Sequence, residues 1–270
     1  MSTLDSDPPG APETIATYVF AVCRGLDPAV LSALPGLSGN TPVRALRFGP
    51  LTAVVQHVEA ALFTAEAWQE RLSDQRELER CARAHHQVVS AAAACGPTVP
   101  LALATLYRGD ERAGQALQQD ADRFHTALRR IEGRVEWGVK VYAATAPAAP
   151  AAPPLAPTGV SRPAPGAGRA YLDRKRGVQR RRELHHDEAL RTADTVDTAL
   201  RALAAASRRL RTHGQEPTGA RGAQVLNAAY LVAADRTEEV ADAVRSLRRL
   251  TGAHIEMSGP WVPYSFAGEV

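Results

Sequence analysis

The sequence predicts a mixed α+β protein built from two domains. Three observations lead to this prediction. Short apolar runs typical of strands alternate with segments whose apolar residues recur every three or four positions, as on one face of a helix. This alternation occurs in both halves of the 270-residue chain. Between the halves lies an alanine- and proline-rich stretch that holds seven of the nineteen prolines, a composition typical of a semi-extended linker.

These observations set the expected domain limits. Residues 1–16 are polar and contain prolines, so we expect a disordered N-terminus. Residues 17–143 are expected to form the N-terminal α+β domain, and residues 144–168 the linker. Residues 169–270 then form a smaller C-terminal α+β domain with a long coiled-coil-like helix.

The N-terminal domain is expected to begin with a strand and a hairpin. Tyr18–Cys23 is an uninterrupted apolar run, and Val43–Phe48 and Leu51–Val58 are two further runs separated only by a Gly-Pro pair. A helix is expected over Thr64–Cys95, because Thr64 suits an N-cap and a second Gly-Pro pair follows Cys95.

The rest of this domain repeats the pattern. Val99–Tyr107 reads as extended, Asp110–Ile131 as a helix, and Arg134–Tyr142 as a strand with alternating apolar residues and one buried face. The order strand, hairpin, helix, strand, helix, strand is close to a ferredoxin-like pattern. It predicts a mainly antiparallel sheet with helices on one face.

The C-terminal domain is expected to begin with a polar helix over Arg169–Thr212. Its apolar residues step alternately by four and three, as in a coiled coil. The seam consists of Ala189, Ala193, Val196, Leu200, Leu203, Ser207 and Leu210. Because only about three heptads show this spacing, the seam suits an intrachain helix pair or a short partner contact.

A strand, a helix and a short strand are expected to follow. Val225–Val232 is apolar enough for a buried strand, and His254–Met257 reads as a second, shorter one. Between them Asp235 and Glu238 have the spacing of a capping box, which predicts a helix beginning there.

Composition excludes several classes of function. Thirty-two basic and twenty-nine acidic residues nearly cancel, so the net charge of +3 does not by itself imply nucleic acid. Three cysteines without a C-x-x-C pair argue against a disulfide framework and favour a reducing cytoplasm. Neither a signal-peptide pattern nor an apolar run near 20 residues is present, so no lipid membrane is expected. Without a nucleophile elbow or a phosphate-binding loop, we expect neither an enzyme nor a cofactor.

Six segments, in this order and spacing, resemble the GvpF/GvpL family of gas vesicle proteins, and together they extend over most of the chain. They are YVFAVC at Tyr18–Cys23, AHHQVV at Ala84–Val89 followed by GPTVPLAL at Gly96–Leu103, LRRIEGRVEWGVKVY at Leu128–Tyr142, GRAYLDRKR at Gly168–Arg176, LNAAYLVAAD at Leu226–Asp235 and MSGPWVPYSF at Met257–Phe266. The chain departs from the family at Pro100–Thr105, where PLALAT replaces the usual PLRFGT.

The resemblance implies a cytosolic accessory protein needed to build gas vesicles, which are protein-walled, gas-filled shells. It implies two α+β domains, the second with a long coiled-coil-like helix. The implied partners are the small hydrophobic shell protein GvpA and other accessory Gvp proteins. The family has no associated catalytic residues, so the resemblance assigns none to this chain.

The densest basic cluster is the first candidate for partner docking. It consists of Arg174, Lys175, Arg176, Arg180, Arg181 and Arg182. A solvated helix face is the favoured interpretation, and docking of an acidic partner comes next. A nucleotide- or nucleic-acid-binding module that uses the sheet and this basic helix start is the alternative function, although only Tyr171 could stack on a base.

The aromatic residues of the tail are the second candidate. Trp261, Tyr264 and Phe266 can close over a domain core, or they can form an exposed anchor for an apolar partner. The core interpretation is favoured, because large rings usually bury much of their surface and the neighbouring prolines suit a tight wrap.

The histidine pairs His85-His86 and His185-His186 raise the question of a metal site. Adjacent residues on a helix point about 100° apart, so such a pair cannot chelate an ion as an i, i+4 pair does. His85 falls on an apolar helix face, which favours a packed, hydrogen-bonded core histidine. No metal site is therefore expected.

Overall fold

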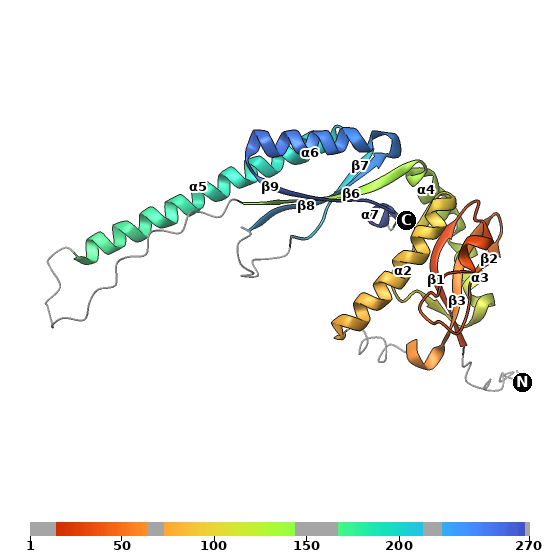
Figure 1. Cartoon of the computed structure of the whole chain (residues 1–270). Coiled ribbons are helices and arrows are strands. Elements are labelled where there is room, and N and C mark those ends of the chain that lie inside the picture. Colours follow the sequence, from red (N-terminus) through yellow and green to blue (C-terminus); the bar gives the residue numbers. More distant parts are fainter. Residues whose placement is uncertain (1–14, 64–72, 144–166, 213–222, 268–270) are drawn as a thin grey trace, which may run out of the picture. The chain divides into compact units, whose positions relative to one another are not determined.

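The computed structural model describes residues 15–63, 73–143, 167–212 and 223–267 (Figure 1). The chain divides into two compact units. The first unit contains Met1–Glu136 together with Trp261–Val270, and the second unit contains Trp137–Pro260. Antiparallel strand pairs occur in both units beside helices, so the fold class is mixed α+β, as the sequence predicts.

The first unit contains a five-stranded sheet. Its strands, in spatial order, are β2 (Val43–Phe48), β3 (Leu51–Glu59), β1 (Ile15–Cys23) and β4 (Thr98–Pro100), and β5 (Leu106–Tyr107) also pairs with β1. All these pairs are antiparallel. The predicted hairpin is present, because Phe48 pairs with Leu51 and Gly49 turns the chain at a φ of 53°.

The described residues of this unit form six helical segments. They are η1 (Pro28–Leu31), η2 (Ala60–Phe63), α2 (Gln75–Cys95), α3 (Gly109–Gln119), α4 (Ala121–Ile131) and α7 (Tyr264–Ala267). The helix predicted over Asp110–Ile131 is two helices, because the backbone leaves helical geometry at Asp120. The start predicted at Thr64 lies outside the described residues, and the described part of α2 begins after the N-cap Asp74.

Helices cover both faces of the first sheet, so the prediction of helices on one face is wrong. Thr17 donates a hydrogen bond to Asp110 of α3, whereas the neighbouring Tyr18 meets His85 of α2. Successive strand residues point to opposite faces, which places α2 and α3 on opposite sides of β1. The sequence signal is the unbroken apolar run of β1, which is buried at eight consecutive positions and therefore on both faces.

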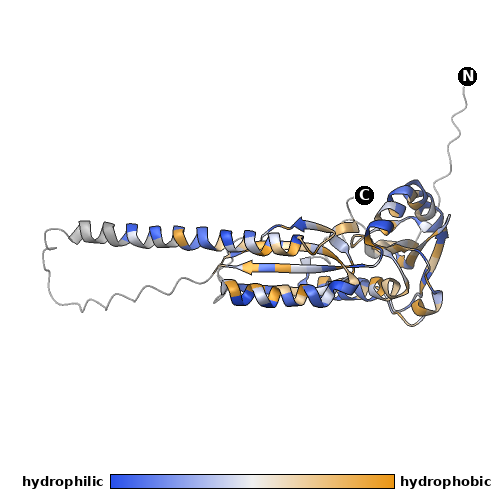
Figure 2. Ribbon diagram, turned by 90° about the horizontal axis from the view of Figure 1, so that it is seen from above, coloured by the Kyte–Doolittle hydropathy of each residue, from blue (hydrophilic) through white to orange (hydrophobic). Residues whose placement is uncertain are grey.

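The second unit has the ferredoxin-like order of elements. It contains β6 (Arg134–Tyr142), α5 (Ala167–Arg201), β7 (Ala206–Arg209), β8 (Gln224–Ala233), η3 (Ala234–Arg236), α6 (Thr237–Thr251) and β9 (His254–Trp261). The strands lie in the order β7-β8-β6-β9. Figures 1 and 2 show α5 and α6 side by side on one face of this sheet.

The sequence analysis placed β6 in the N-terminal domain and the tail in the C-terminal domain, and the structure differs at both points. Only Arg134–Glu136 belongs to the first unit, whereas the remainder of β6 pairs in the second sheet, with Val139 and Val141 fully buried. The tail from Trp261 returns to the first unit. An alternating pattern specifies a half-buried strand but not the sheet that the strand joins.

The predicted long helix ends earlier than expected. α5 stops at Arg201, and Ser207 of the predicted seam lies in β7, where it pairs with Tyr230 of β8. Leu210 likewise follows β7 and bonds to the backbone of Asn227. Pairing with β8 overrides helical spacing here, so the seam on the helix reduces to its first four residues.

The start of α6 also differs from the capping-box prediction. Asp235 lies in the short η3 turn, and α6 begins at Thr237 without a side-chain cap. The arginine of this turn, Arg236, instead forms an ion pair with Glu239. The helix ends at Thr251, where Gly252 follows in a left-handed conformation.

Candidate interaction surfaces

The three tail aromatics take different positions in the first unit. Phe266 is 2% exposed, and the guanidinium of Arg130 lies 5.8 Å from its ring centroid. Trp261 is 45% exposed and Tyr264 is 37% exposed. The tail therefore contributes one core ring and two surface rings.

His86 of α2 lies beside both surface rings. The ring centroids are 5.6 Å apart for His86 and Trp261 and 6.1 Å apart for His86 and Tyr264. The Tyr264 hydroxyl is 3.5 Å from Nδ1 of His86, and burial raises the pKa of Tyr264 to about 12. These three residues form what we call the aromatic–histidine surface, which presents flat rings with polar edges.

The tail is fastened beside this surface by Glu136. The Glu136 carboxylate, which is buried, accepts hydrogen bonds from the backbone N–H of Ser265 at 2.8 Å and from its hydroxyl at 2.6 Å. Charged acceptors make stronger hydrogen bonds than neutral ones. Glu136 therefore holds α7 in the position that sets Tyr264 against His86.

His85 lies beneath the surface and is part of the core. It is 3% exposed, and its Nδ1 is 2.9 Å from the hydroxyl of Tyr18. Burial lowers the pKa of His85 to about 4, although the backbone of Leu101 acts in the opposite direction. The interpretation of His85 as a packed, hydrogen-bonded core histidine is confirmed.

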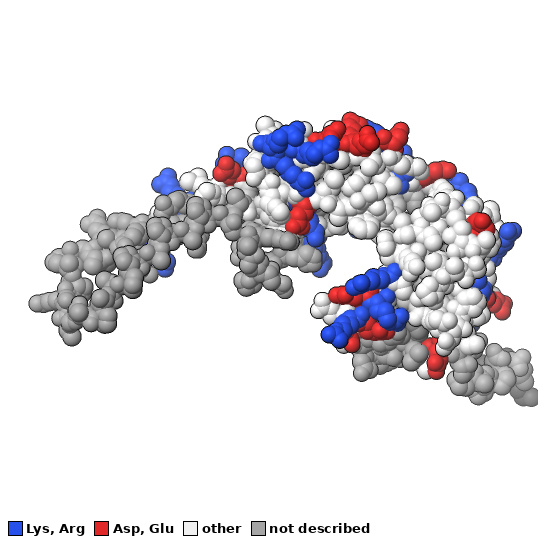
Figure 3. All heavy atoms as spheres, in the orientation of Figure 1, with Lys and Arg blue, Asp and Glu red and all other residues white. Residues whose placement is uncertain are grey.

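The basic cluster lies on the N-terminal half of α5. Lys175, Arg176 and Arg180 are exposed, whereas the side chains of Arg174, Arg181 and Arg182 fall outside the described part of the structure. The structure therefore shows three of the six predicted docking residues on the same helix, and it places them far along the chain from the tail aromatics. Figure 3 shows a different grouping of charge over α6, where basic and acidic side chains lie next to each other.

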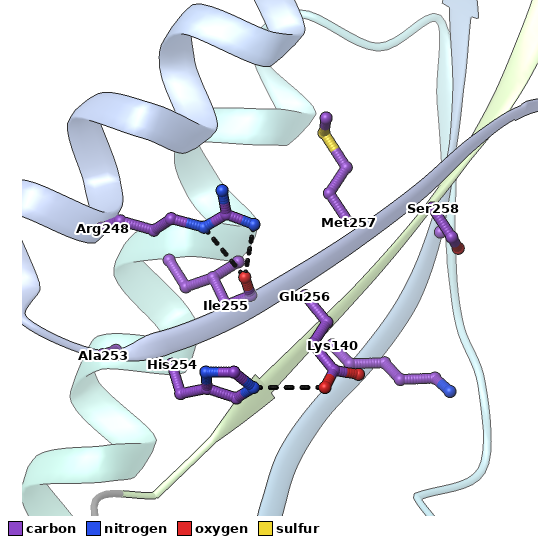
Figure 4. Close-up of a pocket in the computed structure, with 9 residues that line it drawn as sticks. Lys140, Arg248, Ala253, His254, Ile255, Glu256, Met257 and Ser258 are labelled. Carbon is purple, nitrogen blue, oxygen red and sulfur yellow. Dashed lines mark hydrogen bonds and ion pairs between the residues drawn. The ribbon is translucent and has the colours of Figure 1, made fainter.

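An open depression of about 510 Å³ follows β9 in the second unit (Figure 4). Arg248 donates from Nε and Nη2 to the carbonyl of Ile255, at 2.9 and 2.6 Å. His254 lies 3.2 Å from Glu256, which also accepts a hydrogen bond from Tyr142. These side chains form hydrogen bonds to one another and to the backbone. They do not point together toward a position where a substrate atom could bind, so they show no catalytic arrangement.

A charged cluster near the start of α3 is the remaining candidate for chemistry. Arg44 donates to both oxygens of Asp110 at 2.6 and 2.7 Å, and Thr17 and His57 also contact this carboxylate. Burial opposes ionisation of Asp110, but these hydrogen bonds outweigh it and lower its pKa to about 2. The Thr17 hydroxyl donates to a carboxylate whose pKa of about 2 makes it a very weak base, so the cluster anchors α3 to the sheet and does not activate the hydroxyl.

The described residues contain no group of three or more histidine, cysteine or acidic side chains placed to hold a metal ion. Within the same residues, no helix has the length and apolar character needed to cross a bilayer. The sequence analysis did not predict that His86 contacts the tail aromatics, because Trp261 and Tyr264 are more than 170 positions away in the chain. No local pattern could have joined them.

Comparison with known sequences identifies relatives over nearly the whole chain. The family model described as gas vesicle synthesis protein GvpL/GvpF matches residues 16–268. Gas vesicle protein L of Streptomyces sp. (strain CB03234) is 38% identical over 251 residues, which cover 93% of this chain and 92% of that protein. Gas vesicle protein L1 of Halobacterium salinarum is 24% identical over 240 residues, which cover 86% and 83%.

Solved structures show the same fold. The crystal structure of GvpF from Anabaena sp. PCC7120 matches with a TM-score of 0.64 at 17% identity and covers 94% of this chain and 96% of that one. GvpF from Microcystis aeruginosa matches with a TM-score of 0.61 at 15% identity, covering 93% and 98%. By its family match and its 38% identity to a gas vesicle protein L, the chain belongs to the GvpL/GvpF family of gas vesicle synthesis proteins.

Proposed function

We propose that this chain is a non-enzymatic accessory protein of gas vesicle assembly. It acts in the cytoplasm and on the growing vesicle, where it binds the shell protein GvpA and other accessory Gvp proteins during shell nucleation or growth. The observation that carries the proposal is the family match over residues 16–268, which includes both units rather than one shared module.

The apolar surface expected of a gas vesicle shell subunit supports a binding role for this chain. A subunit that walls off gas must carry a large apolar surface, and such surfaces associate indiscriminately when they are exposed. A protein that handles this subunit needs a complementary contact surface and no reactive pocket. The aromatic–histidine surface of His86, Trp261 and Tyr264 has this character, because exposed tryptophan and tyrosine rings are frequent centres of binding energy.

Co-expression with GvpA tests the proposal directly. We expect this chain to raise the soluble fraction of GvpA and to co-purify with it. Two control cultures are compared with it. One expresses GvpA alone, and the other expresses GvpA with an unrelated protein of similar size, to exclude a general effect of co-expressing a second protein. If GvpA stays equally insoluble and no complex forms, the proposed binding is wrong.

Trp261→Ala tests which surface makes the contact. We expect the variant to weaken GvpA binding at least tenfold, because truncating a central tryptophan costs about 2 kcal/mol or more in typical interfaces. Leu250→Ala is the matched control, since Leu250 is a highly exposed apolar residue of the second unit. Equal affinities for both variants and the native chain would remove the aromatic–histidine surface from the proposal.

A further inference from the structure

The second sheet ends in a long strand that is paired on one side. In the order β7-β8-β6-β9, β9 is the last strand, and β6 is its only neighbour among the described strands. β9 has eight residues, whereas the other edge strands of the two sheets, β2, β4, β5 and β7, have two to six. An edge strand presents unpaired N–H and C=O groups, and proteins normally shorten or cover such an edge.

The depression of about 510 Å³ follows β9 along most of its length (Figure 4). Its lining includes six consecutive residues, Ala253 to Ser258, which span about 20 Å in an extended chain. Figure 4 shows Arg248 of α6 on one side of the strand and Lys140 of β6 on the other. The space beside β9 is therefore long enough for a second extended segment.

Two residues of β9 turn their backbone toward this space. The carbonyl of Ile255 accepts both hydrogen bonds from Arg248, at 2.9 and 2.6 Å, so it points away from β6. The N–H and C=O of one strand residue point to the same side and alternate along the strand, which directs those of Met257 outward as well. Among the described residues, the backbone of Met257 forms no hydrogen bond outside the sheet, so this part of the edge is uncovered.

Two cations without an acidic partner lie beside this edge. Within the described residues, Lys140 forms no hydrogen bond or ion pair, and the Arg248 side chain binds only the carbonyl of Ile255. Glu256 is the only acid among the described residues that line the depression, and it already accepts a hydrogen bond from Tyr142 at 3.1 Å. The edge is therefore complementary in charge to an acidic segment.

We propose that β9 accepts an extended acidic segment of a partner protein as a fifth strand of the second sheet. Main-chain hydrogen bonds to Met257 hold the segment, and its side chains select it. Because strand side chains alternate between faces, two adjacent acids reach Arg248 on one face and Lys140 on the other. The inference goes beyond the proposed function, since it concerns a second surface and holds or fails whether or not the aromatic–histidine surface binds GvpA.

A synthetic peptide tests the pairing on the full chain. The probe is a fluorescein-labelled peptide of valine and threonine with two adjacent glutamates at its centre. One control peptide has lysines in place of the glutamates, and the other is N-methylated throughout, so that it cannot donate backbone hydrogen bonds. Fluorescence anisotropy at low ionic strength should show that the acidic peptide binds about tenfold more tightly than either control.

Met257→Pro tests the role of the backbone. It removes one outward N–H and leaves the pairing of β9 with β6 in place, because proline is tolerated on an edge strand whose N–H faces solvent. We expect the acidic peptide to bind this variant about tenfold more weakly than the native chain. Circular dichroism during thermal unfolding checks that the variant is folded. If it is not, the N-methylated peptide decides the same question on the native chain.

Lys140→Glu tests the role of charge. We expect it to weaken binding of the acidic peptide about fivefold and to strengthen binding of the lysine peptide, because it reverses the charge beside the edge. Lys175→Glu is the matched control, since Lys175 is exposed on α5 and does not line the depression. This control should bind both peptides as the native chain does.

Several results would overturn the proposal. Absence of binding at low ionic strength would do so, and so would equal affinities of the native chain for the acidic, lysine and N-methylated peptides. Unchanged binding in Met257→Pro would exclude pairing along β9. If sedimentation velocity shows a native dimer that Met257→Pro abolishes, the strand pairs with a second copy of this chain and not with an acidic partner.

Discussion

At the scale of single residues, adjacent side chains on one helix have opposite environments. His85 lies under the tail against Tyr18, whereas the next residue, His86, faces Trp261 and Tyr264 at the surface. The helical turn of about 100° between neighbours produces this difference. The sequence suggested that His85 is a core residue because it falls on the apolar face of α2. It could not show what His86 contacts, because the contacting residues belong to the distant tail.

The burial of His85 predicts a pH dependence of stability. Its pKa falls from 6.5 to about 4 on folding, so between these values the unfolded chain binds a proton that the folded chain does not. Stability is therefore complete above pH 6.5 and declines as the pH falls toward 4, by up to about 3 kcal/mol. We expect urea unfolding of His85→Gln to show a flatter dependence over this window.

The control for this prediction is His186→Gln, since His186 is exposed on α5 and should leave the native pH dependence unchanged. Asp110 does not interfere, because its pKa is lowered from 3.8 to about 2 and its contribution is lost only below pH 3.8. Equal pH slopes for the native chain and His85→Gln would show that His85 is not the responsible group.

At the scale of elements, one carboxylate joins three of them. Asp197 of α5 is 3% exposed, accepts a hydrogen bond from Tyr230 of β8 at 2.7 Å, and binds Arg209 of β7 at 2.8 and 3.0 Å. This contact ties β7 and β8 to α5, just beyond the point where the helix ends and pairing with β8 begins. The prediction from helical spacing extended this helix to Thr212, because the spacing of apolar residues does not show which distant residues form an ion pair.

Asp197→Ala should therefore destabilise the second unit. Removing Asp197 leaves the buried Tyr230 hydroxyl without its acceptor and takes one of two carboxylate partners from Arg209, which together costs about 1–3 kcal/mol. Urea unfolding at neutral pH measures this loss. Asp194→Ala is the matched control, because Asp194 binds the same arginine but its side chain is 71% exposed, and exposed pairs contribute about 0–1 kcal/mol. Similar losses in both variants would contradict the role of Asp197.

At the scale of the whole molecule, the sequence predicted most elements but not their assignment to units. Nearly every predicted strand and helix exists, since periodicity and Gly-Pro stops are local signals. The alanine–proline stretch was expected to separate the domains, yet it falls between β6 and α5, which both belong to the second unit. The chain crosses between the units after Glu136 and after Pro260, so the second unit is inserted into the first.

This insertion predicts that a residue near the C-terminus stabilises the unit that contains the N-terminal sheet. Phe266→Ala should remove a buried ring from the first unit, at a cost of about 3–5 kcal/mol. Hydrogen exchange should then accelerate in β1 and α2, while β8 keeps its protection. Leu200→Ala, which removes a buried residue of α5, should have the reverse effect, with a cost of about 2–5 kcal/mol confined to the second unit. Faster exchange of β8 in Phe266→Ala, equal to that of β1, would mean that the two units unfold as one cooperative body and that the tail stabilises both.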